Sequence, residues 1–310
     1  MNLEIYGVNY KFCDIKTREK HCINTNEQYL LFDKLKHSGF VPSVIISTCN
    51  RTEYYFDKKN NIYENNSFKN LSGIDAIRHL FRLASGIESQ IIGESEILSQ
   101  IKQAYYNSIK LGMTNSFFNK IFQNAIKVGK YVRNETSISD GNISFASIIF
   151  NKSKEYFKDI SNKNIFILGT GEMAKKMLKY FSAVQANVSV VSGKNYNRAA
   201  LLASEYKVLI NGFNEFKDSI NIADIIITAT ASPHILISDT DLVYIKKPLL
   251  IFDLSVPRNV EKRTNNELVH LYNVDDLRQT SEYNLSERVK YIPVVEKIIE
   301  NEINKLLQKN

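Results

Sequence analysis

Cys49 is the residue of this sequence best placed to act as a nucleophile. It follows an apolar, β-branched run at residues 43–47, lies between Thr48 and Asn50, and precedes Arg51. A thiol at the end of a strand can face a cleft, and a neighbouring cation lowers the pKa of a thiol toward the reactive thiolate. Arg51 could instead bind a substrate carboxylate through two guanidinium nitrogens. The alternative is that Cys49 is a buried structural residue, as most lone cysteines are.

A glycine turn forms the second group of residues with a chemical use. The turn comprises Gly169, Thr170, Gly171, Glu172, Met173 and Ala174. It follows the apolar run at 165–168, and residues 175–181 after it can continue as a helix. In such a turn the first glycine allows the tight bend, the second lets the backbone approach a pyrophosphate, and the small third residue lets helix and strand pack closely. The turn predicts dinucleotide binding; the alternative is an ordinary tight turn of an α/β domain.

The residues after the next predicted strand, 188–191, favour NADP over NAD. An Asp or Glu at that strand end would bind the ribose 2′-hydroxyl, but the sequence has none there and instead has two cations, Lys194 and Arg198. Cations suit a 2′-phosphate. The alternative is that both charges are solvated.

Length and composition limit the kinds of protein that can carry these groups. The chain has 310 residues, 44% hydrophobic and 24% charged, which suits a globular protein of two domains. No stretch approaches the roughly 20 apolar residues of a membrane helix, and the N-terminus lacks the layout of a signal peptide, so we expect a cytoplasmic protein. Cys13, Cys22 and Cys49 form no Cys-x-x-Cys pair and are expected to be free thiols, with no metal site indicated. The net charge of +7 favours an anionic partner.

The patterning divides the chain into α+β, helical and α/β parts. In the first part, a helix at 27–37 accompanies expected strands at 3–9, 43–47 and 52–56. A polar stretch, 58–70, predicts a surface loop, and apolar residues at helical spacing predict helices within 74–84 and 97–105. Beyond residue 164, apolar strands alternate with helical segments and predict a parallel sheet covered on both faces, with strands at 165–168, 188–191, 223–228 and 249–252. A long helical pattern, 284–308, ends the chain, and Pro293 predicts a kink in it or a start near that residue.

Several motifs together resemble those of the glutamyl-tRNA reductase family in order and spacing. They are Ser47-Thr48-Cys49-Asn50-Arg51, His79-Leu80-Phe81-Arg82-Leu83-Ala84-Ser85-Gly86, Gly93-Glu94-Ser95-Glu96-Ile97-Leu98-Ser99-Gln100, the glycine turn, Asp253-Leu254-Ser255-Val256-Pro257-Arg258 and Asn273-Val274-Asp275-Asp276-Leu277. The resemblance covers nearly the whole chain. It implies an N-terminal α+β catalytic domain at 1–150, a Rossmann-like NADP-binding domain at 151–276 and a C-terminal connecting helix at 277–310.

The resemblance also implies a reaction. The Cys49 thiolate would attack the ester carbonyl of glutamyl-tRNA, release the tRNA and leave a glutamyl thioester, which accepts hydride from NADPH to give glutamate-1-semialdehyde. This is the first step toward 5-aminolevulinate and therefore of tetrapyrrole, porphyrin and haem synthesis. Because the tRNA ester has already activated the acid, no ATP site is needed.

By the same resemblance, the glutamyl pocket comprises Thr48, Cys49, Asn50, Arg51, Ser89, Glu94, Ser95, Glu96 and Gln100. Arg51 would pair with the γ-carboxylate. His79 matches a histidine important for activity in the family, where it would polarise the carbonyl or handle a proton. A satisfied, partly buried histidine would give the same pattern. Glu96 stands where the family more often has Gln, so we expect it to face away from the substrate or to hydrogen-bond an amine.

The expected partners are glutamyl-tRNA and, for the unstable product, glutamate-1-semialdehyde aminomutase. The sequence stops within what resembles the connecting helix, so we expect the family's C-terminal dimerisation domain to be missing or reduced, which leaves homodimer formation open. Between residues 102 and 133 there is no acidic residue, and aromatic residues are interspersed with six basic ones: Lys102, Lys110, Lys120, Lys127, Lys130 and Arg133. These could hold tRNA phosphates, or they could be a solvated lysine face over core aromatics.

Two other functions are compatible with parts of the sequence. A dehydrogenase of a free small acid or aldehyde would share the nucleotide fold, which by itself does not select a substrate. A non-catalytic tRNA-binding relative would share the N-terminal part. The presence of Cys49, Arg51, His79 and the glycine turn in one chain argues against the second.

Overall fold

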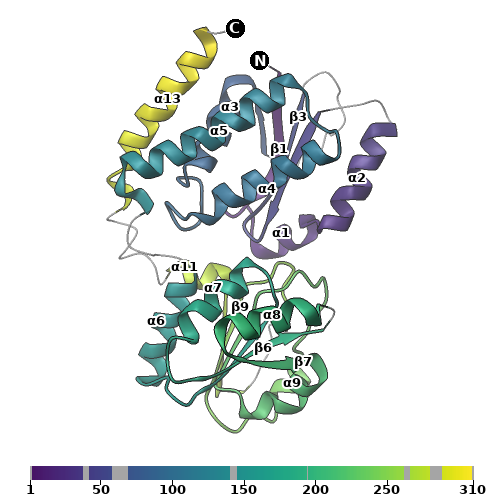
Figure 1. Cartoon of the computed structure of the whole chain (residues 1–310), viewed down its shortest axis with the longest axis vertical. Coiled ribbons are helices and arrows are strands. Elements are labelled where there is room, and N and C mark those ends of the chain that lie inside the picture. The colour runs from purple at the N-terminus through teal and green to yellow at the C-terminus, as the bar shows by residue number, and fades with distance from the viewer. Residues whose placement is uncertain are drawn as a thin grey trace. The chain divides into compact units, whose positions relative to one another are not determined.

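The computed structural model describes residues 2–37, 42–57, 69–139, 145–193, 195–261, 266–279 and 288–308. They belong to two compact units, one formed by Met1–Ile143 with Glu282–Asn310 and the other by Ser144–Ser281. Each unit has its own sheet (Figure 1). None of the helices in these ranges combines the length and the apolar character needed to cross a membrane.

The first unit is built on a four-stranded antiparallel sheet in the order β2-β3-β1-β4. Its strands are β1 (Leu3–Asn9), β2 (Ser43–Thr48), β3 (Arg51–Asp57) and β4 (Lys69–Ser72). Its helices are α1 (Ile15–His21), α2 (Thr25–His37), α3 (Gly73–Ala84), α4 (Glu96–Lys110), α5 (Ser116–Glu135), the short 3₁₀ helix η1 (Ser137–Ser139) and α13 (Ile292–Gln308).

Alternation along the strands gives this sheet two apolar faces. On one face Ile5, Val44 and Tyr55 join the main core with side chains of α3, α4 and α5. On the other face Ile45 and Phe56 pack with Phe32 and Leu35 of α2 and with Met113. Since successive strand residues point to opposite faces, both layers follow from the sequence period of two.

One expectation for this unit changes, and of the two alternatives for Pro293 the helix start is confirmed. Lys69 and Asn70, expected in a surface loop, lie in β4, which pairs with β1 because that strand has a free edge; residues 58–68 lie outside the described ranges. The C-terminal helix begins at Ile292, so Pro293 marks its start, where no intrahelical N–H is needed. This helix, α13, packs against α3 and α5, and Figure 1 shows the three side by side.

The second unit has a six-stranded sheet in which every strand is parallel to its neighbours, in the order β10-β9-β8-β5-β6-β7. The strands are β5 (Asn164–Leu168), β6 (Asn187–Ser192), β7 (Leu209–Gly212), β8 (Ile225–Thr228), β9 (Leu249–Asp253) and β10 (Val269–Asn273). The helices are α6 (Phe145–Phe157), α7 (Glu172–Phe181), α8 (Tyr196–Tyr206), α9 (Phe213–Ser219), η2 (Ile220–Ile222), α10 (Asp239–Leu242) and α11 (Val274–Gln279).

This strand order is that of the Rossmann fold, in which the first strand is central and the direction of winding reverses between it and the fourth. Here β5 is the central strand, and the reversal lies between β5 and β8. The four apolar strands predicted from the sequence are confirmed, as is the parallel sheet. They were recognisable because a strand buried on both faces is apolar throughout.

The units divide the chain at slightly different positions from the sequence-based domains. Residue 150 lies inside α6, which belongs to the second unit as a whole. The C-terminal helix is part of the first unit because its buried residues Val295, Ile299 and Ile303 join the main core there.

Candidate functional site

Cys49 lies in a two-residue connection between β2 and β3. Thr48 and Arg51 are paired across this turn, and the Thr48 hydroxyl oxygen accepts the backbone N–H groups of both Asn50 and Arg51 at 3.2 Å. The Asn50 carbonyl in turn accepts the backbone N–H of Tyr10 at 3.0 Å. The turn that carries the thiol is therefore held on both sides, with Asn50 buried and Cys49 half-buried.

The electrostatic surroundings of Cys49 differ from those expected. Burial, which is the largest cause, and the charges of Glu94 and Glu96 together raise the pKa of the thiol to about 12, while Arg18 of α1 opposes them. The pKa of this thiol is thus raised, not lowered as expected from a neighbouring cation, and the guanidinium of Arg51 is paired with Glu53. A thiol with so high a pKa is almost entirely protonated at neutral pH.

This environment predicts how alkylation of Cys49 depends on pH. Because the thiolate reacts and its pKa lies near 12, the rate should rise about tenfold per pH unit from pH 7 to 10 without a plateau. Glu96→Gln removes a charge that raises the pKa, so it should speed alkylation at pH 8. Iodoacetamide labelling of the Cys49 peptide, followed by mass spectrometry, measures both, with Glu302→Gln on α13 as the control. A plateau below pH 9 in the unsubstituted protein would contradict this description.

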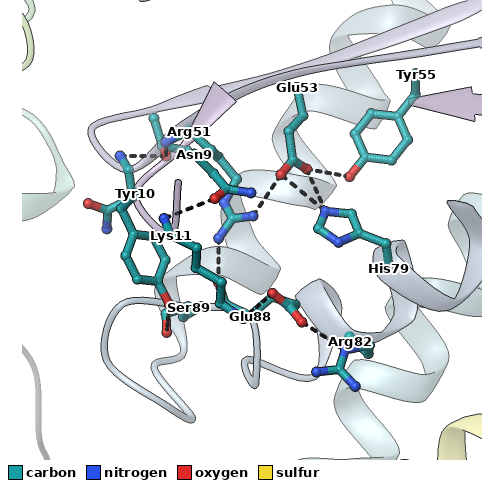
Figure 2. Close-up of polar contacts among 12 residues, drawn as sticks. Asn9, Tyr10, Lys11, Arg51, Glu53, Tyr55, His79, Arg82, Glu88 and Ser89 are labelled. Carbon is teal, nitrogen blue, oxygen red and sulfur yellow. Dashed lines mark hydrogen bonds and ion pairs between the residues drawn. The ribbon is translucent and has the colours of Figure 1, made fainter. Parts of the chain in front are cut away.

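Arg51 is a buried member of an ion-paired cluster shown in Figure 2. Its Nη1 donates to Glu53 Oε1 at 2.8 Å, and its Nη2 donates to the backbone carbonyl of Glu88 at 2.5 Å. Only 2% of the residue is exposed. Its Nε is buried and has no hydrogen-bond partner among the residues described.

Glu53 connects Arg51 to His79. The carboxylate accepts hydrogen bonds from Arg51, from the Tyr55 hydroxyl at 2.8 Å and from His79 Nε2, which is 3.1 Å from both of its oxygens. Burial by itself would raise the pKa of Glu53, but the charges of His79 and Arg51 outweigh it and hold that pKa well below its usual range. His79 is buried and hydrogen-bonded, as a satisfied histidine would be, and its functional role stays a prediction.

The loop 85–95, between α3 and α4, is tied down by side chains from several elements. Five backbone carbonyls in it accept side-chain hydrogen bonds of 2.5–3.0 Å, from Arg51 to Glu88, Tyr10 to Ser89, Arg288 to Ile92, Ser139 to Gly93 and Arg133 to Glu94. Gly93 has φ +78°, and a Cβ there would lie 1.8 Å from the Ile138 carbonyl oxygen. The loop is therefore held by contacts from several elements of the first unit.

The expected pocket residues in and after this loop differ in their exposure. Ser89 and Glu94 are buried, Glu96 is half-buried, and Ser95 and Gln100 are exposed. Of these, Glu94 and Glu96 act on Cys49 through their charges.

Sequence reasoning missed two carboxylates of the cluster, Glu53 and Glu88. Glu88 bridges Lys11 and Arg82, and Arg82 also pairs with Glu296 of α13. The sequence does contain a pattern that could have identified Glu53. Glu53 alternates with Arg51 and Tyr55 along β3, so the three side chains share one face of the sheet.

In the second unit the glycine turn follows β5 and packs closely against the backbone that follows β8. Gly169 has φ +117°, and a Cβ there would lie 2.3 Å from the Ala229 carbonyl oxygen, so only glycine fits. Gly171 is the N-cap of α7, and a Cβ there would meet no atom within 4 Å, so the space beside the helix N-terminus is open. Ala174 is fully buried between helix and strand. These are the steric features that a dinucleotide pyrophosphate needs.

For the remaining residues of this predicted cofactor site, the structure shows only how exposed they are. Thr170 and Met173 are half-buried, and Glu172 is exposed in the first turn of α7. Lys194 lies outside the described residues, and Arg198, in the first turn of α8, is exposed.

The basic segment at 102–133 falls on α4 and α5. Tyr105, Phe118 and Phe122 are core residues, whereas Tyr106 and Tyr131 are exposed. Arg133 does not belong to a phosphate-binding surface, because it donates to the carbonyls of Ala84, Gly129 and Glu94, and burial lowers its pKa to about 10. The exposed cations here are Lys110, Lys127 and Lys130.

Comparison with known proteins also divides the chain into an N-terminal part and a nucleotide-binding part. Residues 6–136 match the family model of the glutamyl-tRNA(Glu) reductase N-terminal domain, and residues 151–280 match that of shikimate/quinate 5-dehydrogenase. Proteins named glutamyl-tRNA reductase from Methanococcus aeolicus and Methanococcus maripaludis are 38% and 33% identical. These alignments cover 97% and 98% of this chain and 78% and 79% of the relatives. The solved structure of glutamyl-tRNA reductase from Methanopyrus kandleri is 33% identical over 99% of this chain and 80% of that one, with a TM-score of 0.57.

Proposed function

Because the chain belongs to the glutamyl-tRNA reductase family, we propose that it reduces the glutamyl group of glutamyl-tRNA to glutamate-1-semialdehyde, the first step of tetrapyrrole synthesis, with NADPH as reductant. The observation that carries the proposal is that one chain of this family combines a thiol on a fixed strand turn with a glycine turn open for a pyrophosphate.

In the first half of the reaction Cys49 would take the glutamyl group. Its sulfur would bond to the ester carbonyl carbon, the bond from that carbon to the tRNA ribose oxygen would break, and the thiol proton would end on the departing oxygen. A thioester results, which accepts hydride far more readily than a carboxylate does.

Because the pKa of the Cys49 thiol is high, the bound substrate itself would have to help form the thiolate. The α-ammonium group of the glutamyl ester would offset the charges of Glu94 and Glu96, two of the causes that raise this pKa. The bound substrate would thereby favour the thiolate. The buried Nε of Arg51 lacks a partner among the described residues and would be a donor for the γ-carboxylate.

The second unit offers a steric fit for the cofactor. Gly169 and Gly171 would let the backbone come close to the pyrophosphate, whose charge the N-terminus of α7 would stabilise. Lys194 would pair with the 2′-phosphate. Bound NADPH would supply the hydride that converts the thioester to the aldehyde, and Cys49 would leave as the thiolate and take up a proton from water. The unstable product would pass, in the cytoplasm, to glutamate-1-semialdehyde aminomutase, the partner that the family resemblance implies.

The experiment that tests this function is an assay of the purified protein with glutamyl-tRNA, with and without NADPH. We expect semialdehyde only with NADPH, and slow release of free glutamate without it as the thioester hydrolyses. Reduction of free glutamate or of a small aldehyde without tRNA would instead identify a dehydrogenase. Binding of tRNA with neither product would identify a non-catalytic relative.

Lys127 and Lys130, one turn apart on the exposed face of α5 beside Tyr131, are proposed to contact tRNA phosphates. Replacing both by Ala should weaken glutamyl-tRNA binding and reduce the slope of log K against log salt by about one for each lost contact. Titrations at several salt concentrations measure this slope. Lys36→Ala, on the helix that covers the opposite face of the sheet, should leave it unchanged. An unchanged slope in the double variant would exclude this surface.

A further inference from the structure

The carboxylate of Glu53 accepts more hydrogen bonds than a simple ion pair with Arg51 would give it. Three side chains donate to one carboxylate: Arg51 through Nη1, Tyr55 through its hydroxyl and His79 through Nε2. A small pocket lined in part by Asn9 and Phe12 reaches Glu53 and His79, so the cluster is not sealed inside the core.

The hydrogen bonds define the position of the proton on His79. An ionised carboxylate can only accept hydrogen bonds, so the Nε2 atom that bonds to Glu53 must carry a hydrogen. In the neutral ring Nδ1 is then unprotonated. Nδ1 has no hydrogen bond among the residues that the structure describes, and Figure 2 shows this nitrogen turned away from Glu53.

Glu53 has little freedom to move. It is 2% exposed and lies opposite Gly7 of β1. A Cβ on Gly7 would lie 2.3 Å from the Thr52 carbonyl oxygen and 2.8 Å from the Glu53 Cα, so the strands approach closely there. In its protonated form His79 also helps to lower the pKa of Glu88, so a second carboxylate lies near the ring. Lys11 and Arg82 bind that second carboxylate, which leaves Glu53 as the one bonded to His79.

We propose that Glu53 is a positioning residue, which fixes the proton of His79 on Nε2 and leaves Nδ1 as the ring nitrogen that accepts and returns a proton. This inference rests on the proposed reductase activity. Glutamyl transfer moves one proton from the Cys49 thiol to the ribose oxygen, and no net proton is gained or lost in that step. A ring with a fixed tautomer holds the same basic atom ready in every turnover.

Glu53→Gln tests the proposal because an amide cannot reproduce the three contacts. Arg51 can only donate, so it retains the single amide oxygen, and the amide NH₂ then faces Tyr55 and His79. An NH₂ group facing Nε2 favours the opposite tautomer, with the proton on Nδ1. The shape of the side chain is preserved while the basic nitrogen is lost.

The experiment combines kinetics with ¹⁵N NMR of histidine-labelled protein at alkaline pH, where the neutral ring reports its tautomer. His79→Gln identifies the His79 signals among the five histidines. In the unsubstituted protein we expect a protonated Nε2. In Glu53→Gln we expect the proton to move to Nδ1 and kcat to fall by about 10², with KM for glutamyl-tRNA and the cooperativity of thermal unfolding nearly unchanged. The matched control is Glu300→Gln. It breaks the ion pair between Glu300 of α13 and Arg78, which lies next to His79 on α3, and should alter neither the tautomer nor kcat.

A protonated Nδ1 in the unsubstituted protein, or a Glu53→Gln variant with unchanged kcat, would overturn the proposal. A fall in kcat matched by an equal loss of folded protein would also overturn it, because it would reduce Glu53 to a stabilising residue. Should the unsubstituted protein fail to reduce glutamyl-tRNA, the proposed function fails, and the tautomer measurement still decides whether Glu53 fixes the proton.

Discussion

Cys49→Ser is expected to abolish formation of glutamate-1-semialdehyde while leaving NADPH binding intact. A hydroxyl is a far weaker nucleophile than a thiol, and an ester formed by Ser would not be activated toward hydride as a thioester is. We expect kcat to fall by at least about 10³, the scale on which removal of a nucleophile acts. A coupled assay of NADPH oxidation and aldehyde formation measures the loss, and fluorescence titration measures NADPH affinity.

The matched control for this variant is Cys13→Ser. Cys13 is another half-buried thiol of the first unit, and burial raises its pKa as well. It follows β1 rather than the β2–β3 turn, so its replacement should leave turnover within a factor of two. Turnover by Cys49→Ser close to that of Cys13→Ser would remove the nucleophile from the mechanism.

Gly169→Ala is expected to have the second largest effect. At φ +117° an L-residue is strained, and the new methyl would lie 2.3 Å from the Ala229 carbonyl oxygen. Strain of this kind costs about 1–3 kcal/mol before any clash is added. We expect the second unit to be destabilised by at least about 2 kcal/mol and NADPH binding to weaken more than tenfold, measured by chemical denaturation and by titration.

Gly171→Ala separates the two effects of the glycine turn. There φ is −80°, and the added methyl would meet no protein atom within 4 Å. Stability should therefore stay within about 0.5 kcal/mol, while NADPH binding should weaken because the methyl occupies the space needed by the pyrophosphate. Unchanged NADPH affinity in Gly171→Ala would mean that the cofactor does not approach this turn.

The parts of the fold that could be predicted were those determined by local pattern. The apolar strands of the second unit, the glycine turn and the helix at 73–84 each show their type within a dozen residues. The strand β4 could not be found in this way, because its polar residues become a strand only by pairing with β1. Long-range pairing overrides local composition in such segments.

The chemistry of the site was harder to predict, because it depends on contacts distant in sequence. The turn that carries Cys49 was recognisable, but its pKa is raised by burial and by carboxylates that the loop 85–95 and the start of α4 bring near. Arg133 was counted among phosphate-binding cations, yet it donates to backbone carbonyls around that loop. Sequence identifies which residues can do chemistry, and folding decides which charges they meet.

The most direct test of the account is to trap the glutamyl group on the enzyme. Protein incubated with glutamyl-tRNA labelled in the glutamyl group, without NADPH, should retain label that survives acid denaturation and is released by hydroxylamine, as a thioester is. Peptide mapping should place that label on Cys49, and added NADPH should discharge it as the aldehyde. Label absent from the protein, or attached to another residue, would contradict the account.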